Sequence, residues 1–269
     1  MPLWLYWNWC KRVRMDRKIA LLIEYDGTKF YGFQYQPHYP TIQGEIKNAI
    51  TGLNLSLGRI EGAGRTDTGV HALGQVVSFD TNSSLDIEDI ESGINHFLPT
   101  DIAVQKAYEV SIKFSPRRDA ISRRYRYTFL TRSTRSPLSE RYAFRIAKPV
   151  DIEKMTKALF VLKGTHDFVN LCGKYEGSTI RNLIDVSLNI DEEKFYIDLE
   201  ANAFLPHQVR RIAGLLYQVG LNKFEIKDIV KILNREEDNY IRPNIPTLPA
   251  CGLVLLKVKY KDMFEYDYY

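Results

Sequence analysis

The spacing of hydrophobic residues in the first half of the chain predicts an alternation of strands and helices. Residues 19–25 (IALLIEY) form a nearly continuous apolar run that ends at Asp26-Gly27, which is typical of a buried strand followed by a turn. Elements with weaker patterns follow it: helices over 43–53 and 87–97, and strands over 75–80 and 102–108. This order of elements closes an α+β unit near residue 110.

The second half shows the same kind of pattern without repeating the sequence of the first. Strands are predicted over 125–130, 184–190, 195–199 and 252–260, and helices over 152–162, 209–219 and 226–233. We therefore predict an α+β fold in which two similar α/β halves form a mixed, mostly antiparallel central sheet flanked by helices. The predicted organisation is an N-terminal extension (1–16), an N-terminal domain (17–112) and a C-terminal domain (113–269).

The net charge of +4 hides a strongly basic segment. Residues 111–148 contain eleven Lys and Arg residues against two acidic ones, which gives this segment a charge of +9 and leaves −5 for the rest. Aromatic residues such as Tyr125 and Tyr127 alternate with its arginines. This pattern favours a surface that faces RNA, and the alternative is a solvated basic face over a core of aromatic rings.

Cysteine content and hydropathy exclude several other classes. The 3 cysteines are far apart and form no CxxC pair, so we expect neither a disulfide framework nor a cysteine zinc site. This cysteine usage is typical of a protein of the reducing cytoplasm. No run of 18 apolar residues predicts a membrane-spanning helix. In the apolar opening, the basic residues follow the apolar run, which is the reverse of a secretory signal, so we expect Met15 to be the functional start.

The strongest candidate chemistry lies in residues 62–74 (GAGRTDTGVHALG). Four glycines in thirteen residues indicate a tight backbone that another group approaches closely. The third glycine of a dinucleotide-binding G-x-G-x-x-G would fall at Asp67, whose charge would repel a pyrophosphate. Arg65 and Asp67 would lie on one face of an extended segment, where an arginine keeps a carboxylate ionised and oriented as a nucleophile. A structural salt bridge explains the pair equally well.

Two other interpretations have less support. The strand that runs into Asp26-Gly27-Thr28 is similar to phosphatases of the haloacid dehalogenase type, but Glu24 stands where their aspartate nucleophile would be. His71, His166 and His207 have no H-E-x-x-H or similar spacing, so no metal site is predicted. His71 and His207 could hydrogen-bond loops near a cleft without being catalysts.

Six segments occur in an order that resembles one family. They are DGTKFYGFQ at 26–34 with TIQ at 41–43, GRTDTGVHA at 64–72, RRYRY at 123–127, GTHDF at 164–168, FLPHQVRRIAG at 204–214 and PACGL at 249–253. Over roughly residues 18–260 the chain resembles the tRNA pseudouridine synthase A family. The resemblance implies a pseudouridine synthase fold and the isomerisation of uridine to pseudouridine in the tRNA anticodon stem-loop, at positions 38, 39 and/or 40, without a cofactor.

The same resemblance assigns roles to individual residues. Asp67 matches the catalytic aspartate, which forms a covalent intermediate with the extruded nucleoside by attack at uracil C6 or ribose C1′. Arg65 would pair with it, and Tyr125 would stack on the base and take part in proton transfer at C5. Arg210 would lie near the catalytic acid, and Leu253 would line the base pocket. Tyr125 and Leu253 could equally be ordinary strand and core residues.

The resemblance also predicts the partners of the chain. Arg123, Arg124 and Arg126 belong to the basic segment and are expected to bind the tRNA substrate. We expect a cytoplasmic homodimer with no membrane contact and no nucleotide or metal cofactor. A non-catalytic tRNA-binding or chaperone protein that keeps the same fold is the alternative, and the intact Arg65, Asp67 and Tyr125 argue against it.

Overall fold

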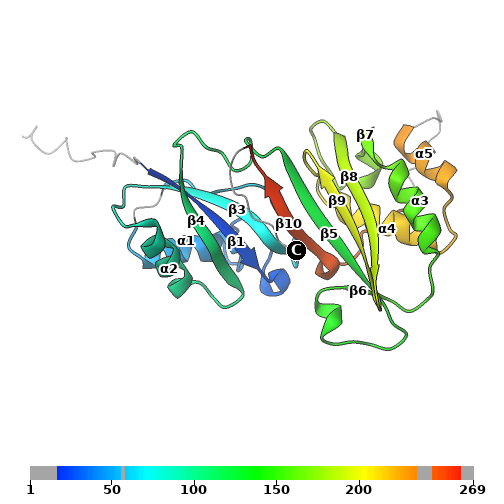
Figure 1. The fold of residues 1–269 in the computed structure, drawn as a ribbon, viewed down its shortest axis with the longest axis horizontal. Coiled ribbons are helices and arrows are strands. Elements are labelled where there is room, and N and C mark those ends of the chain that lie inside the picture. Colours follow the sequence, from blue (N-terminus) through cyan, green and yellow to red (C-terminus); the bar gives the residue numbers. More distant parts are fainter. Residues whose placement is uncertain (1–16, 56–57, 235–243, 262–269) are drawn as a thin grey trace, which may run out of the picture.

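The computed structural model describes residues 17–55, 58–234 and 244–261, and within these ranges the chain forms a ten-stranded sheet with five α-helices (Figure 1). The strands are β1 (Arg17–Tyr25), β2 (Glu61–Gly62), β3 (His71–Thr81), β4 (Ile102–Val110), β5 (Ser122–Thr131), β6 (Phe144–Ile146), β7 (Gly164–Asp167), β8 (Ile180–Asp191), β9 (Lys194–Ala201) and β10 (Leu253–Lys259). The helices are α1 (Ile42–Gly52), α2 (Ile87–Phe97), α3 (Ile152–Val161), α4 (Gln208–Gly220) and α5 (Ile226–Asn234). The predicted extension, including the expected start at Met15, lies outside the described residues.

The sheet is continuous across the boundary predicted near residue 112. Its main order is β4-β1-β3-β10-β5-β9-β8-β7, with β2 on β3 and β6 on β5. The pairs β3–β10 and β5–β6 are parallel and the others antiparallel, so the predicted mixed, mostly antiparallel sheet is confirmed. β10 lies between the two halves: Leu255 is in register with Ala72 on β3 and with Tyr125 on β5.

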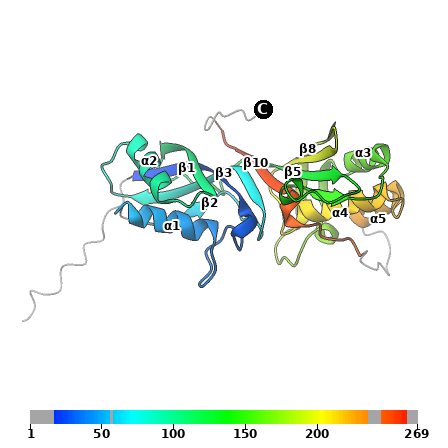
Figure 2. The ribbon, with the colours of Figure 1, turned by 90° about the horizontal axis from the view of Figure 1, so that it is seen from below.

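The helices form two groups at the two ends of the sheet, with β3, β10 and β5 between them (Figure 2). In the first group, Ile90 and Ile94 of α2 are fully buried, and the Thr41 side chain caps α1 by accepting a hydrogen bond from Gly44 N at 3.2 Å. In the second group, α3 packs against α4, α5 and β8, and α4 also packs against β5. This packing holds the beginning of α4 near the middle of the sheet.

Several short elements are absent from the prediction. β2, β6 and β7 have two, three and four residues, too few for a recognisable alternation of apolar and polar positions. Two 3-10 turns bear on the site: η1 (Gly27–Lys29) follows β1, and η2 (Ser139–Arg141) precedes β6. None of the helices in the described ranges has the length and apolar character needed to cross a bilayer.

Candidate active site

Asp67 lies in the loop of residues 63–70 between β2 and β3, called the Asp67 loop below. The loop packs on the segment 30–33, because Phe33 N donates to the Thr66 carbonyl at 3.1 Å and Gly69 N to the Phe30 carbonyl at 3.3 Å. At Gly32, φ is +86° and a Cβ would lie 2.8 Å from the Thr66 carbonyl oxygen, so only glycine permits this approach. The DGTKFYGFQ segment therefore supports the loop that holds Asp67.

Buried polar contacts hold the same loop from the side of the sheet. The Tyr25 hydroxyl lies 2.8 Å from Thr66 Oγ1, and Gln75 Nε2 donates to the Gly64 carbonyl at 3.0 Å. Burial raises the pKa of Tyr25 to about 12, so this hydroxyl stays protonated at neutral pH. Together with the contacts to residues 30–33, these bonds fix the loop on both sides of Asp67.

The carboxylate of Asp67 is paired with Arg210 from the first turn of α4. Arg210 Nη1 lies 2.9 Å from Asp67 Oδ2, and its Nε donates to the Leu248 carbonyl at 2.7 Å. Two partners at fixed positions set the plane of the guanidinium and so the direction from which it meets the carboxylate. The Asp67 side chain remains 29% exposed, which leaves it accessible to a substrate.

His207 is a further neighbour of the carboxylate. Its Nε2 lies 3.7 Å from Asp67 Oδ2, and its backbone has the left-handed conformation, with φ of 61°, at the residue that precedes α4. A non-glycine residue in this conformation is uncommon and marks a constrained position. The sequence offered a weak signal for this neighbour, because His207 lies in the FLPHQVR segment one helical turn before Arg210.

The structure corrects one contact that the sequence predicted. Arg65 is exposed and, in the part of the chain that the structure describes, it forms no ion pair with Asp67. Arg65 and Asp67 are both accessible on either side of buried Thr66, as the spacing argument expects, but a shared face does not by itself bring the two charged groups into contact. Arg210, 143 residues away in sequence, pairs with Asp67 instead.

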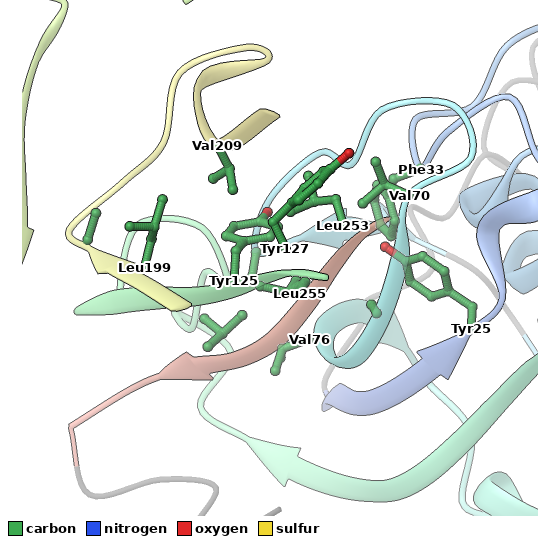
Figure 3. Close-up of a cluster of buried hydrophobic side chains, with 14 of the residues drawn as sticks. Tyr25, Phe33, Val70, Val76, Tyr125, Tyr127, Leu199, Val209, Leu253 and Leu255 are labelled. Carbon is green, nitrogen blue, oxygen red and sulfur yellow. The ribbon is translucent and has the colours of Figure 1, made fainter. Parts of the chain in front are cut away.

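Tyr127 on β5 has a structural hydrogen bond. It is fully buried, and its hydroxyl donates to the Pro249 carbonyl at 2.9 Å. Burial raises its pKa far above the ordinary value, so the phenol is permanently neutral. Its ring packs in the cluster shown in Figure 3.

Tyr125, two residues earlier, is placed differently. It is 8% exposed and its ring lies edge-on to Phe204 with centroids 5.1 Å apart, and across residues 17–55, 58–234 and 244–261 its hydroxyl has no hydrogen-bond partner. A Cβ at Gly64 would lie 4.0 Å from that hydroxyl, so it reaches the Asp67 loop. Burial raises the pKa of Tyr125, and the negative charge of Asp67 raises it further. Tyr125 is therefore a neutral phenol beside the carboxylate.

Leu253 is part of the apolar cluster beneath the Asp67 loop. It begins β10, is 6% exposed and lies in register with Tyr127. Figure 3 shows it among side chains that come from several strands and from α4, including Val70 of the loop and Val209 of the helix. Leu253 is buried within this cluster, and its contact with a base stays a prediction.

Arg123 was predicted to bind substrate, and the structure gives it four backbone partners. Its Nη1 donates to the carbonyls of Ala120 at 3.2 Å and Asn202 at 2.9 Å, and its Nη2 to those of Ala63 at 3.0 Å and Arg117 at 2.7 Å. Burial lowers its pKa. These bonds tie the Asp67 loop to the second half of the chain, and substrate contact by Arg123 stays a prediction.

Arg124 and Arg126 also have a protein partner. Arg126 binds Asp198 through Nε at 2.7 Å and Nη2 at 2.9 Å, and Arg124 Nη2 lies 3.3 Å from the same carboxylate, which is 2% exposed. The guanidinium of Arg126 also lies 4.8 Å from the ring centroid of Tyr196. Both arginines remain 35% exposed and face away from Tyr125 because strand residues alternate between faces. Their contact with substrate stays a prediction.

The site contains no candidate metal centre. Among the described residues, no group of three or more His, Cys, Asp and Glu side chains is placed to hold a metal ion. The groups that meet at the site are a carboxylate, a guanidinium, an imidazole and a neutral phenol, beside an apolar surface. A carboxylate held in this way has the chemistry of a nucleophile.

Comparison with known proteins identifies the family. The profile described as tRNA pseudouridine synthase matches residues 21–117 and 158–261. The chain belongs to the tRNA pseudouridine synthase family. It is 39% identical to tRNA pseudouridine synthase A of Thermoanaerobacter sp. (strain X514) over 249 residues, which are 91% of this chain and 100% of that relative. For tRNA pseudouridine synthase A of Geobacter sp. (strain M21), the identity is 35% over 254 residues, with 91% and 100% covered.

Membership in the tRNA pseudouridine synthase family makes the chain an isomerase. The matched ranges include Asp67, Arg210 and Leu253, whereas Tyr125 and Arg123 fall between them. Among solved structures, an H/ACA ribonucleoprotein bound to a substrate RNA containing 2′-deoxyuridine is matched with a TM-score of 0.35 and 9% identity, over 88% of this chain and 46% of that chain. That similarity is too low to carry a conclusion.

Proposed function

We propose that the protein converts uridine to pseudouridine in the anticodon stem-loop of tRNA, at positions 38, 39 and/or 40, with Asp67 as the nucleophile. The observation that carries the proposal is the Asp67 carboxylate, partly exposed and held 2.9 Å from Arg210 beside an apolar surface. Related tRNA pseudouridine synthases A, matched over 91% of the chain, support the choice of tRNA. In this proposal the target base leaves the stem and lies against Leu253 and Tyr125.

The reaction rearranges one nucleoside without redox change. The bond between C1′ and N1 breaks, the uracil rotates, and a bond from C1′ to C5 forms. The C5 proton is lost and N1 takes up a proton, so atoms and electrons balance. Asp67 forms a transient bond to the nucleoside, at uracil C6 or ribose C1′, and that bond breaks when the product is complete. Arg210 keeps the carboxylate in one orientation throughout.

Tyr125 and Arg65 would complete the site in this proposal. Because its pKa is raised by burial, Tyr125 reaches the base as a neutral phenol that can pass on the proton lost from C5. Its ring also offers a face on which uracil can stack. Arg65, exposed beside Asp67, would contact the ribose or phosphate of the extruded nucleotide.

The basic segment 111–148, with its charge of +9, would bind the RNA backbone. Arg124 and Arg126 keep part of their surface exposed while paired with Asp198, so they can add to the positive potential. Binding of tRNA should weaken steeply as salt rises, and a flat salt response would contradict this surface.

We further propose a cytoplasmic homodimer, as in the family. Sedimentation of the free protein measures its oligomeric state.

Release of tritium from tRNA labelled at uridine C5 tests the proposal. Wild type should release tritium, whereas Asp67→Ala and Asp67→Asn should bind tRNA and release none. Asp185→Asn is the matched control. Asp185 lies on the distant strand β8, and its half-exposed carboxylate is paired with Lys163. Sequencing of the modified nucleotides in the wild-type product then gives the positions.

The two possible failures of this assay have different meanings. Binding of tRNA without tritium release by wild type would point to a non-catalytic tRNA-binding protein. Undiminished release by Asp67→Ala would leave a synthase but remove Asp67 from its mechanism.

A further inference from the structure

A pocket of about 490 Å³ adjoins the Asp67 loop and is separate from the contacts of Asp67 itself. Its walls come from four parts of the chain: Thr28 in η1, Gly69 in the Asp67 loop, residues of the segment 135–141 that ends with η2, and Cys251 just before β10. Gly69 is two residues from Asp67, so the pocket lies next to the place where the target nucleotide would be held. Arg135 and Arg141 belong to the basic segment 111–148, but the sequence did not single them out as site residues.

The pocket carries net positive charge. Arg135 and Arg141 are exposed, and within the described ranges neither forms an ion pair with a carboxylate. The acid in the wall, Glu140, is already neutralised by Arg145, whose Nε lies 2.9 Å from Glu140 Oε1. Glu140 also accepts a hydrogen bond from Ser136 N at 2.6 Å. Arg141 hydrogen-bonds Tyr142, and Arg135 lies near enough to Glu140 to help lower the pKa of that carboxyl. Both side chains are exposed, so each guanidinium keeps donors for an external anion.

The other nearby acid, Asp26, is occupied as well. Its Oδ1 accepts from Thr28 N at 2.9 Å, and its Oδ2 accepts from the Tyr142 hydroxyl at 2.9 Å. Partial burial would raise the pKa of Asp26, but these hydrogen bonds and the nearby His71 ring bring it below the ordinary value. Asp26 therefore stays ionised, with both oxygens bonded to the protein.

The same contacts position one wall of the pocket. Tyr142 is bonded to Asp26, and its ring lies 5.1 Å from the buried His71 ring in an edge arrangement. Tyr142 directly follows Arg141, so this contact across 116 residues fixes the segment that presents Arg141 to the pocket. Preorganisation of this kind lowers the entropy lost when a ligand binds.

Two exposed guanidinium groups beside the Asp67 loop match the chemistry of a phosphodiester. We infer that this pocket binds a backbone phosphate of the tRNA strand adjacent to the extruded nucleotide, with Arg135 and Arg141 as its ligands. The inference rests on the proposed tRNA substrate. Extrusion of a base costs a few kcal/mol, and a phosphate held next to it keeps the strand in the distorted conformation.

Salt-dependent binding of an anticodon stem-loop RNA tests the pocket. Arg135→Gln with Arg141→Gln should weaken binding about tenfold and make the plot of log affinity against log salt shallower by roughly one. Lys227→Gln is the control. It removes one positive charge from α5, where Lys227 is paired with the exposed Glu225. Both pocket arginines are exposed, so the melting temperature of the double variant should stay near that of wild type.

A neutral phosphate identifies the ligand. We compare stem-loop RNAs that each carry one uncharged methylphosphonate, at a different position in each RNA. At one position the substitution should weaken binding to wild type but should not weaken binding to the double variant, relative to the unmodified RNA. Equal sensitivity of both proteins at every position, or a double variant that behaves like Lys227→Gln, overturns the inference. Absence of tritium release by wild type would instead overturn the proposed function, so the two failures are distinguishable.

Discussion

Arg123 donates a hydrogen bond of 3.0 Å to the carbonyl of Ala63, four residues before Asp67. The same guanidinium binds the carbonyls of Arg117 and Asn202. The position of the Asp67 loop is thereby coupled to the start of β5 and the end of β9. A lysine cannot replace this arrangement, because its single ammonium group does not present donors in a planar fork.

Arg123→Lys should lower the free energy of unfolding by about 2 kcal/mol, since hydrogen bonds from a charged donor are lost. We expect kcat to fall further than tRNA affinity, because the loop shifts while the charge remains. Denaturation and single-turnover kinetics measure the two effects. Arg181→Lys is the control, because Arg181 also donates to backbone carbonyls, those of Ser178 and Ile180, but far from Asp67. Weakened tRNA binding at unchanged kcat would instead make Arg123 a substrate contact.

Phenylalanine substitutions should separate the two tyrosines of β5. Tyr127→Phe removes the bond to Pro249 and should cost about 1 kcal/mol of stability with little change in kcat. Tyr125→Phe loses no protein hydrogen bond in the described structure, so stability should hold while kcat falls about 100-fold through the lost proton transfer. Thermal unfolding and tritium release of both variants provide the test. A fully active Tyr125→Phe would limit this residue to stacking.

Substitution of Arg210 should affect the chemical step. Arg210→Gln removes the charge beside Asp67, and we expect kcat to fall about 100-fold with a smaller change in KM. Arg210→Lys keeps the charge but cannot reach both Asp67 and the Leu248 carbonyl, so its kcat should lie between those of Arg210→Gln and wild type. Single-turnover rates give the order, and equal rates in all three proteins would exclude a role for the pair.

Tyr25 should contribute to loss of stability in alkali. Its pKa is 10.0 when unperturbed and is raised to about 12 by burial in the folded protein, so the folded state keeps the proton longer. Its contribution is complete below pH 10 and is lost as the pH rises through about 12, up to about 3 kcal/mol. In Tyr25→Phe, the free energy of unfolding should decrease less between pH 10 and about pH 12 than it does in wild type. An unchanged slope in urea titrations would show that Tyr25 does not titrate in this way.

Local patterns predicted most of the regular elements. The helix expected over 87–97 is observed as Ile87–Phe97, because its isoleucines recur at helical spacing and face the core. The apolar run 19–25 became β1, which lies inside the sheet between β4 and β3. Both predictions succeeded because the signal lies within a dozen residues.

Long-range contacts were beyond the reach of such patterns. Nothing in the last strand indicates that it pairs with β3 as well as β5, and nothing near Asp67 indicates that its partner is Arg210 rather than Arg65. The spacing of Arg65 and Asp67 misled because two residues on one face need not form an ion pair, and the guanidinium that Asp67 meets comes from α4. Tertiary packing decides such contacts.

The central place of β10 has a consequence for biosynthesis. A ribosome makes residues 253–259 after every other strand, and until then β3 and β5 expose edges with unpaired backbone groups. The nascent halves can acquire their helices early, but the strand that joins them is made after both halves. Catalytic competence should therefore require synthesis of residues 253–259, and products that stop before residue 253 should be inactive and prone to aggregate.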